Sequence, residues 1–165
     1  MESFHINNEK SVIAAIAITL VIVASVVTVV YVWYRPEASG YSTLYLLDAQ
    51  NQAVNYPDLL VINNNNSINV QVVVENHLAK PQDYQLQVKI TQNTASFPLN
   101  TTAYSTYEKR LDDSDIWENQ VPVSINQPGD YSVVFELWSK GTEETTYTFT
   151  QNFCVLHLQV VADEA

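Results

Sequence analysis

The sequence is poor in the residues from which several familiar kinds of site are built. Its 165 residues include 1 Cys, 3 Gly, 3 His and 7 Lys or Arg. A single cysteine excludes a disulfide framework or a multi-thiolate metal centre within the chain, and so few glycines disfavour a glycine-rich phosphate-binding loop. Against 18 acidic residues the formal net charge is −11. We therefore expect no nucleic-acid partner, because phosphate binding needs clustered cations.

What the chain has instead is a long apolar run near its N-terminus. Residues 11–34 contain no charged side chain, and about 20 apolar residues suffice to cross a bilayer. The run ends in aromatic residues and Arg35, not in the small residues of a signal-peptide cleavage site. The sequence therefore predicts a transmembrane helix over residues 11–34 that is retained as a single-pass anchor in contact with membrane lipid.

The rest of the chain is long enough for one globular domain. We predict an N-terminal cytoplasmic tail over residues 1–10, a linker over 35–41 and an extracytoplasmic domain over 42–165. The free amino terminus and Lys10 precede the apolar run and Arg35 follows it, so a small excess of positive charge favours a cytoplasmic N-terminus.

Two further features favour the same orientation in the cell membrane. Two tripeptides, beginning at Asn65 and Asn100, match the acceptor pattern for N-glycosylation. Both asparagines are possible glycosylation sites, which fits a domain outside the cytoplasm. The five cations after Arg35 all lie far from the helix.

Alternation of apolar and polar residues replaces the continuous run after the linker. Residues 67–76 place Ile68, Val70, Val72 and Val74 on one face, and residues 84–90 repeat the pattern with Lys89 on the polar face. This period of two is typical of half-buried strands with one wet face. Further such runs cover residues 42–47, 59–62, 103–111, 116–125, 130–139 and 145–161.

Turn-forming clusters separate these runs, among them residues 63–66, 112–115 and 126–129. Seven or eight short strands spaced in this way predict an all-β fold, an immunoglobulin-like antiparallel β-sandwich on a single N-terminal transmembrane helix. Tyr131, which opens a strand directly after a turn, is a candidate for a tyrosine corner.

Small residues recur every four positions along the apolar run. Ser11, Ala15 and Thr19 follow this spacing, which lets a second helix approach closely and makes them a possible helix–helix contact. The alternative is a solitary anchor that contacts only lipid.

Cys154, His157 and His77 suggest a copper site, because β-sandwich electron-transfer proteins use one Cys and two His. However, residues three apart on a strand face opposite sides, so Cys154 is expected inside and His157 outside. We therefore predict a buried thiol and a surface histidine, with no metal and no cofactor.

Four acidic residues between positions 112 and 118 suggest calcium, but no glycine allows the sharp turn of a calcium loop. A polar hairpin turn is the default interpretation. No G-x-S-x-G motif is present, and no Ser or Cys has an evident base, so we expect no enzymatic activity. An exposed Trp117 or Trp138 beside Tyr104 and Tyr107 would form an aromatic binding patch; the alternative is that both tryptophans pack inside.

Several short motifs carry a family resemblance, and they run in a fixed order from residue 41 to residue 161. They are YSTLYLLD (41–48), NYP (55–57), VVVENH (72–77), KRL (109–111), WE (117–118), PG (128–129) and LHL (156–158). This series resembles the exported domain of an archaeal membrane-protein family known as domain of unknown function 1616. The resemblance implies an archaeal source, a surface-facing β-sandwich and a membrane tether, and it carries over no catalytic residue. Longer members of that family have several membrane helices, whereas one is predicted here.

A second resemblance concerns the N-terminus. Lys10-Ser11 before a long apolar helix is similar to archaeal pilin-like proteins, in which a peptidase removes the polar leader.

We predict from the sequence a non-enzymatic accessory subunit or protein-interaction module at the archaeal cell envelope, with a protein partner in a membrane or cell-surface complex. A pilin-like or filament-associated subunit is the alternative, and a metal or redox domain comes third. A mature chain that begins at Val12 would favour the pilin interpretation.

Overall fold

A computed structural model describes residues 8–33, 40–48, 51–54, 56–63, 66–93, 96–141 and 144–162. It divides the chain into two compact units, residues 1–39 and residues 40–165. Each unit is described by itself.

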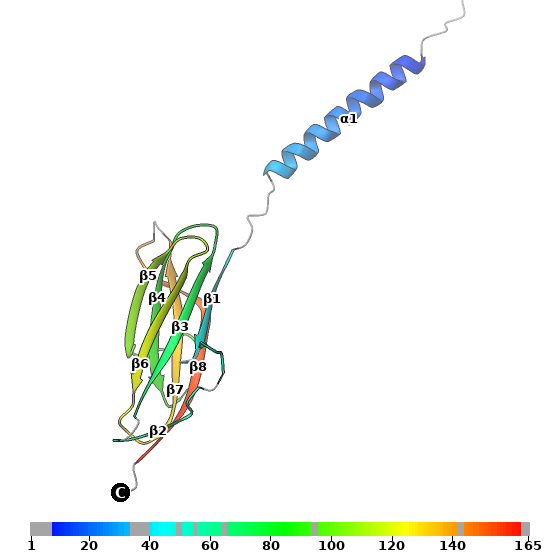
Figure 1. Ribbon diagram of the computed structural model, residues 1–165. Coiled ribbons are helices and arrows are strands. Elements are labelled where there is room, and N and C mark those ends of the chain that lie inside the picture. Colours follow the sequence, from blue (N-terminus) through cyan, green and yellow to red (C-terminus); the bar gives the residue numbers. More distant parts are fainter. Residues whose placement is uncertain are drawn as a thin grey trace, which may run out of the picture. The chain divides into compact units, whose positions relative to one another are not determined.

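The described residues of the first unit form one helix, α1 (Asn8–Trp33), shown in blue in Figure 1. Its 26 residues correspond to about 39 Å at 1.5 Å per residue. The apolar stretch Val12–Tyr31 is long enough to cross a membrane, and its side chains are exposed within this unit. The hydroxyl groups of Thr19 and Thr28 donate to backbone carbonyls four residues earlier, so these two hydroxyls are hydrogen-bonded within the helix.

The second unit is a β-sandwich of two sheets (Figure 1). Its strands, among the described residues, are β1 (Tyr41–Leu47), β2 (Leu59–Val61), β3 (Ser67–His77), β4 (Gln82–Thr91), β5 (Ser105–Leu111), β6 (Ile116–Ser124), β7 (Gly129–Lys140) and β8 (Thr148–Val161). One sheet has the order β1-β3-β6 and the other β2-β8-β7-β4-β5. The predicted fold class, an immunoglobulin-like β-sandwich, is confirmed.

The alternating residues form the core as predicted. Ile68, Val70, Val72 and Val74 of β3 are all buried, and they face the inner side chains of β4, β7 and β8. Burying one such aliphatic side chain contributes about 1.5–3 kcal/mol. With Cys154 as a free thiol, packing of these faces stabilises the domain.

One pairing departs from the antiparallel prediction. β2 pairs with β8 in parallel, through Leu59–Gln159, Leu60–Val160 and Val61–Val161. The chain leaves β1 in one sheet and joins the other sheet at β2, and such a crossing connection allows a parallel neighbour, whereas a tight hairpin does not.

The face of β4 that was predicted to be polar is also not exposed to solvent along its whole length. Lys89 is 4% exposed, because residues 96–104 fold back over the outer face of the five-stranded sheet. Alternation identifies the two faces of a strand, but it does not show which loop covers a face.

Candidate functional site

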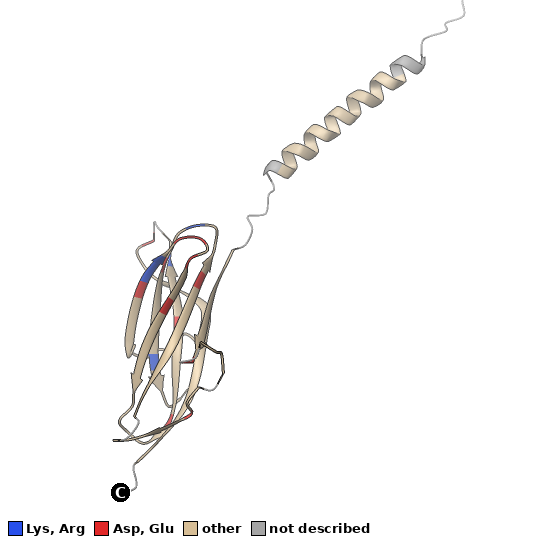
Figure 2. Ribbon diagram, viewed as in Figure 1, with Lys and Arg blue, Asp and Glu red and all other residues tan. Residues whose placement is uncertain are grey.

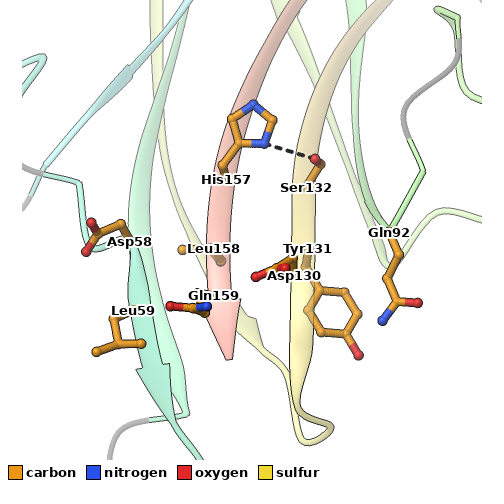
Figure 3. Close-up of a pocket in the computed structure, with 9 residues that line it drawn as sticks. All are labelled: Asp58, Leu59, Gln92, Asp130, Tyr131, Ser132, His157, Leu158 and Gln159. Atoms are coloured by element: carbon orange, nitrogen blue, oxygen red, sulfur yellow. Dashed lines mark hydrogen bonds between the residues drawn. The ribbon is translucent and has the colours of Figure 1, made fainter. Parts of the chain in front are cut away.

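An open groove of about 630 Å³ lies where β2, β7 and β8 meet on the five-stranded sheet (Figure 3). Its lining residues are Asp58, Leu59, Gln92, Asp130, Tyr131, Ser132, His157, Leu158 and Gln159. Gly129 opens β7 beside this groove with φ +147°, and a Cβ there would lie 2.9 Å from the Gln92 amide nitrogen. Glycine is therefore needed at this rim of the groove.

Ser132 and His157 lie side by side in the wall of the groove. They are directly opposed in the β7–β8 ladder, and Ser132 Oγ lies 3.1 Å from His157 Nδ1 (Figure 3). Among the described residues this is the only hydrogen bond of the His157 ring, so no carboxylate orients the imidazole as a catalytic triad requires. The pair forms a fixed polar surface in the wall of the groove.

Asp58 and Asp130 give the groove its charge. Both residues are exposed, and in the part of the chain that the structure describes neither carboxylate has a basic group within 4.0 Å. Two carboxylates without a counter-ion attract cations.

The basic residues of the sandwich lie elsewhere. Lys80, Lys109, Arg110 and Lys140 belong to the β3–β4 turn and to the final residues of β5 and β7, at the opposite end of the strands from Asp130 (Figure 2). Lys89 is buried and paired. Over the described residues, the exposed charges at the groove end of the domain are therefore acidic.

Asn76 organises the end of the sandwich opposite the groove. Its fully buried side-chain amide donates to the carbonyls of Lys80, Leu111 and Asp112, and its oxygen accepts from Tyr84 Oη at 3.1 Å. These contacts, which we term the Asn76 cluster, hold the β3–β4 turn against the end of β5. Asn76 thus has the capping role that its position before a turn suggests, and burial raises the pKa of Tyr84.

Lys89 and Glu136 form a second buried polar cluster. Lys89 Nζ donates to Glu136 at 2.8 Å and to the Leu99 carbonyl at 2.7 Å, while the Leu99 N–H donates to the other Glu136 oxygen at 2.6 Å. Trp138 adds a weaker contact from its indole N–H at 3.3 Å. We term these groups the Lys89 clamp; the two charged side chains are 47 positions apart, and sequence reasoning did not find the pair.

The free edge of β1 is closed by side chains. Its alternate carbonyls, those of Ser42, Leu44 and Leu46, accept hydrogen bonds from Asn152, Cys154 and Tyr56 respectively. The ladder register shifts in β8 near Gln151, whose φ is 68°, and this irregularity lies next to Asn152. Burial raises the pKa of the Cys154 thiol.

The other sheet edges carry features that disfavour strand addition. β6 contains the exposed Pro122, and β5 carries the exposed charges of Glu108, Lys109 and Arg110. β2 has only 3 residues. Proline, charges and short length are the usual protections of an edge.

A network of Tyr45, Glu75 and His77 lies on the outer face of the three-stranded sheet. Tyr45 Oη donates to Glu75 at 2.7 Å, and His77 Nε2 lies 2.9 Å from the other carboxylate oxygen. The hydrogen bond from His77 has the largest effect in lowering the pKa of Glu75, and the bond from Tyr45 lowers it further. The same bond to Glu75 raises the pKa of Tyr45.

The glycosylation and helix-contact predictions remain untested. Asn65 lies outside the described residues, whereas Asn100 is exposed. In α1, Ala15 is exposed and its carbonyl accepts the Thr19 hydroxyl at 2.9 Å; the Ser11 side chain also lies outside the described residues.

The residues considered for copper are separated as predicted. Cys154 faces the core and His157 faces outward, while His77 lies in the other sheet. The acidic stretch forms the polar turn that was the default: Asp113 accepts the Ala79 N–H at 2.8 Å and Asp115 accepts the Asp112 N–H at 3.1 Å.

The aromatic patch does not form. Trp117 is half-buried and packs against the core, and Trp138 is half-buried and contacts Phe149. The tyrosine-corner prediction is also not met, because the Tyr131 hydroxyl makes no hydrogen bond with any described residue. The ring of Tyr131 instead packs against the core beside the groove.

Comparison with solved structures agrees with the fold. The CARDB domain of the PF1109 protein from Pyrococcus furiosus, solved in complex with di-metal ions, is 17% identical, with a TM-score of 0.51 over 75% of this chain and 96% of that one. A PapD-like domain of human CEP192 is 10% identical with a TM-score of 0.37, covering 79% and 89%. The CooA pilin of enterotoxigenic Escherichia coli is 10% identical with a TM-score of 0.32, covering 73% and 99%. At these identities the first likeness shows the fold alone, and the other two carry no argument.

Comparison of the sequence itself assigns the family. No curated protein matches the chain. Residues 36–160 match the family described as domain of unknown function (DUF1616), which covers the sandwich with all its strands up to the last residues of β8. The chain therefore belongs to the DUF1616 family.

Proposed function

We propose that this protein is a non-enzymatic, membrane-anchored interaction module whose sandwich binds a basic segment of a protein partner in the acidic groove. Helix α1 spans the membrane with the N-terminus in the cytoplasm, and the sandwich lies outside the cytoplasm. The protein then acts as an accessory subunit of a membrane or cell-surface complex.

The groove, whose two carboxylates have no ion-pair partner in the described part of the chain, is the observation that carries this proposal. Asp58 and Asp130 lie on either side of Gln159, next to the Ser132–His157 pair, in an open depression that a peptide side chain can enter (Figure 3). A Lys or Arg of the partner would form charge-assisted hydrogen bonds there, and exposed pairs of this kind contribute up to about 1 kcal/mol each. The protected edges of β1, β5 and β6 direct binding to the groove rather than to strand addition.

The anchor adds to the affinity. A partner in the same membrane meets the groove at a raised effective concentration, so modest contacts suffice for a stable complex. The net charge of −11 also favours a basic partner during encounter.

The test is purification of the full chain from its native membranes in gentle detergent, followed by identification of the proteins that accompany it. The double variant Asp58→Asn/Asp130→Asn removes both groove charges and is expected to lose the partner. Glu108→Gln/Glu118→Gln removes two charges from other surfaces and is the matched control.

The outcome that supports the proposal is a partner retained by the control and lost by the groove variant. Raised salt should weaken the same complex, because exposed ion pairs are screened. A wild-type protein that is reproducibly alone and monomeric would overturn the proposal.

A further inference from the structure

We infer that Asn100 is an N-glycosylation acceptor, and this inference rests on the extracytoplasmic placement of the sandwich proposed above. The site is the tripeptide Asn100-Thr101-Thr102 in the connection between β4 and β5. Two observations, the fixation of the flanking backbone and the exposure of the tripeptide itself, carry the inference.

The backbone on both sides of the tripeptide is fixed to the sheet. On the N-terminal side, both backbone groups of Leu99 bond to the Lys89 clamp, at 2.6 Å and 2.7 Å. On the C-terminal side, the Tyr104 N–H donates to the Val88 carbonyl at 2.7 Å. Residues 100–103 are therefore held between two points that are fixed to the sheet.

The tripeptide itself is free for reaction. Asn100, Thr101 and Thr102 are all exposed, and the Asn100 side-chain amide makes no hydrogen bond with any described residue. A shallow recess of about 240 Å³ adjoins Asn100 and is lined by the polar side chains of Thr91, Asn93 and Ser96. Polar groups of this kind can hydrogen-bond the first sugar after its attachment.

The chemistry is a substitution without any change of oxidation state. The Asn100 amide nitrogen attacks the anomeric carbon of a lipid-linked phosphosugar. A C–N bond forms, the C–O bond to the phosphate breaks, and the lipid phosphate departs with the bonding electron pair. The amide loses one proton to a base of the transferase, which recognises the hydroxyl of Thr102 at the second position after the acceptor.

The test is peptide-level mass spectrometry of the full chain isolated from its native membranes. We expect the Asn100 peptide to carry a glycan in the wild type. Asn100→Gln and Thr102→Ala should lose the glycan completely, whereas Thr101→Ala keeps the acceptor pattern and should retain it. Thr101→Ala and Thr102→Ala are matched controls for each other, because both change an exposed threonine of the same loop.

A topology measurement on the same cells separates this inference from the proposal on which it rests. The exposed Glu108 is replaced by Cys, and intact cells are treated with a membrane-impermeant thiol reagent, with the wild type, whose thiol is Cys154, as the baseline. An unmodified Asn100 in a sandwich that is labelled from outside would overturn the glycosylation site and leave the proposed function standing. An unmodified Asn100 with no labelling from outside would overturn both the glycosylation site and the proposed function. A glycan that persists in Thr102→Ala would overturn the assignment of the site alone.

Discussion

The outer face of the five-stranded sheet contains two regions that treat charge in opposite ways. In the Lys89 clamp, a carboxylate and an ammonium group are buried, paired and bonded to the backbone of a covering loop. In the groove, a few residues away along the same β7, Asp58 and Asp130 are exposed without a counter-ion among the described residues.

The difference shows that one sheet face holds charged side chains in two ways, buried and paired or exposed and unneutralised. A buried charge must be fully paired, because desolvation without compensation costs several kcal/mol. An exposed carboxylate has no such requirement and remains available to a ligand. The loop of residues 96–104 causes this difference in burial, because it covers Lys89 and Glu136 but does not cover the groove.

The largest expected effect comes from breaking the clamp. Lys89→Met leaves Glu136 buried without its counter-ion, and we expect the free energy of unfolding to fall by about 3–5 kcal/mol. The measurement is denaturant unfolding of the full chain in detergent, followed by circular dichroism. Lys89→Met/Glu136→Leu removes both charges and should recover much of the loss; a single variant as stable as the wild type would show that the clamp is not a structural ion pair.

The Asn76 cluster is expected to be the next most sensitive site. Asn76→Ala leaves the carbonyls of Lys80, Leu111 and Asp112 without their common donor, and we expect a loss of about 1–3 kcal/mol. Asn69→Ala, an exposed position of the same strand, is the control and should change stability by less than about 0.5 kcal/mol. Equal effects at the two positions would contradict the role assigned to Asn76.

A smaller effect is expected at Glu75, and it depends on pH. Because His77 and Tyr45 lower its pKa, the stabilisation is complete above the ordinary value of 4.5 and is lost as the pH falls below it through the lower folded-state pKa. Glu75→Gln should therefore reduce stability at neutral pH by less than about 1 kcal/mol, and the difference from the wild type should shrink in acid. Unfolding curves at several pH values test this; a difference that grows in acid would contradict it.

The smallest effect on stability is expected in the groove. Asp58→Asn/Asp130→Asn should change the free energy of unfolding by less than about 0.5 kcal/mol, because neither carboxylate forms an ion pair with a described residue. The measurement is thermal unfolding of the groove variant and of Lys89→Met under the same conditions. A loss as large as that of the clamp variant would show that these acids support the fold.

Local patterns in the sequence account for much of this architecture. The alternation in β3 and β4 identified the inner faces, and the period of β8 separated Cys154 from His157. Such patterns depend only on neighbours along the strand. They therefore required no knowledge of the pairing between strands.

Features that depend on distant segments were not predicted. Lys89 is buried by a loop that folds back over it and over Glu136, and Glu136 lies 47 positions from Lys89 in the sequence. The parallel pairing of β2 requires a crossing between sheets. The groove likewise combines residues from Asp58 to Gln159. Acidic residues that are scattered along the sequence do not indicate which of them will lie on the same surface.

Site-specific photo-crosslinking in native membranes tests the binding role of the groove most directly. A photoreactive residue replaces Gln159, which lines the groove, or Gln120, an exposed glutamine of β6 in the other sheet. The account predicts that position 159 crosslinks to one discrete protein and that position 120 does not. Crosslinking of that protein from position 120 alone, or equally from both positions, would contradict it.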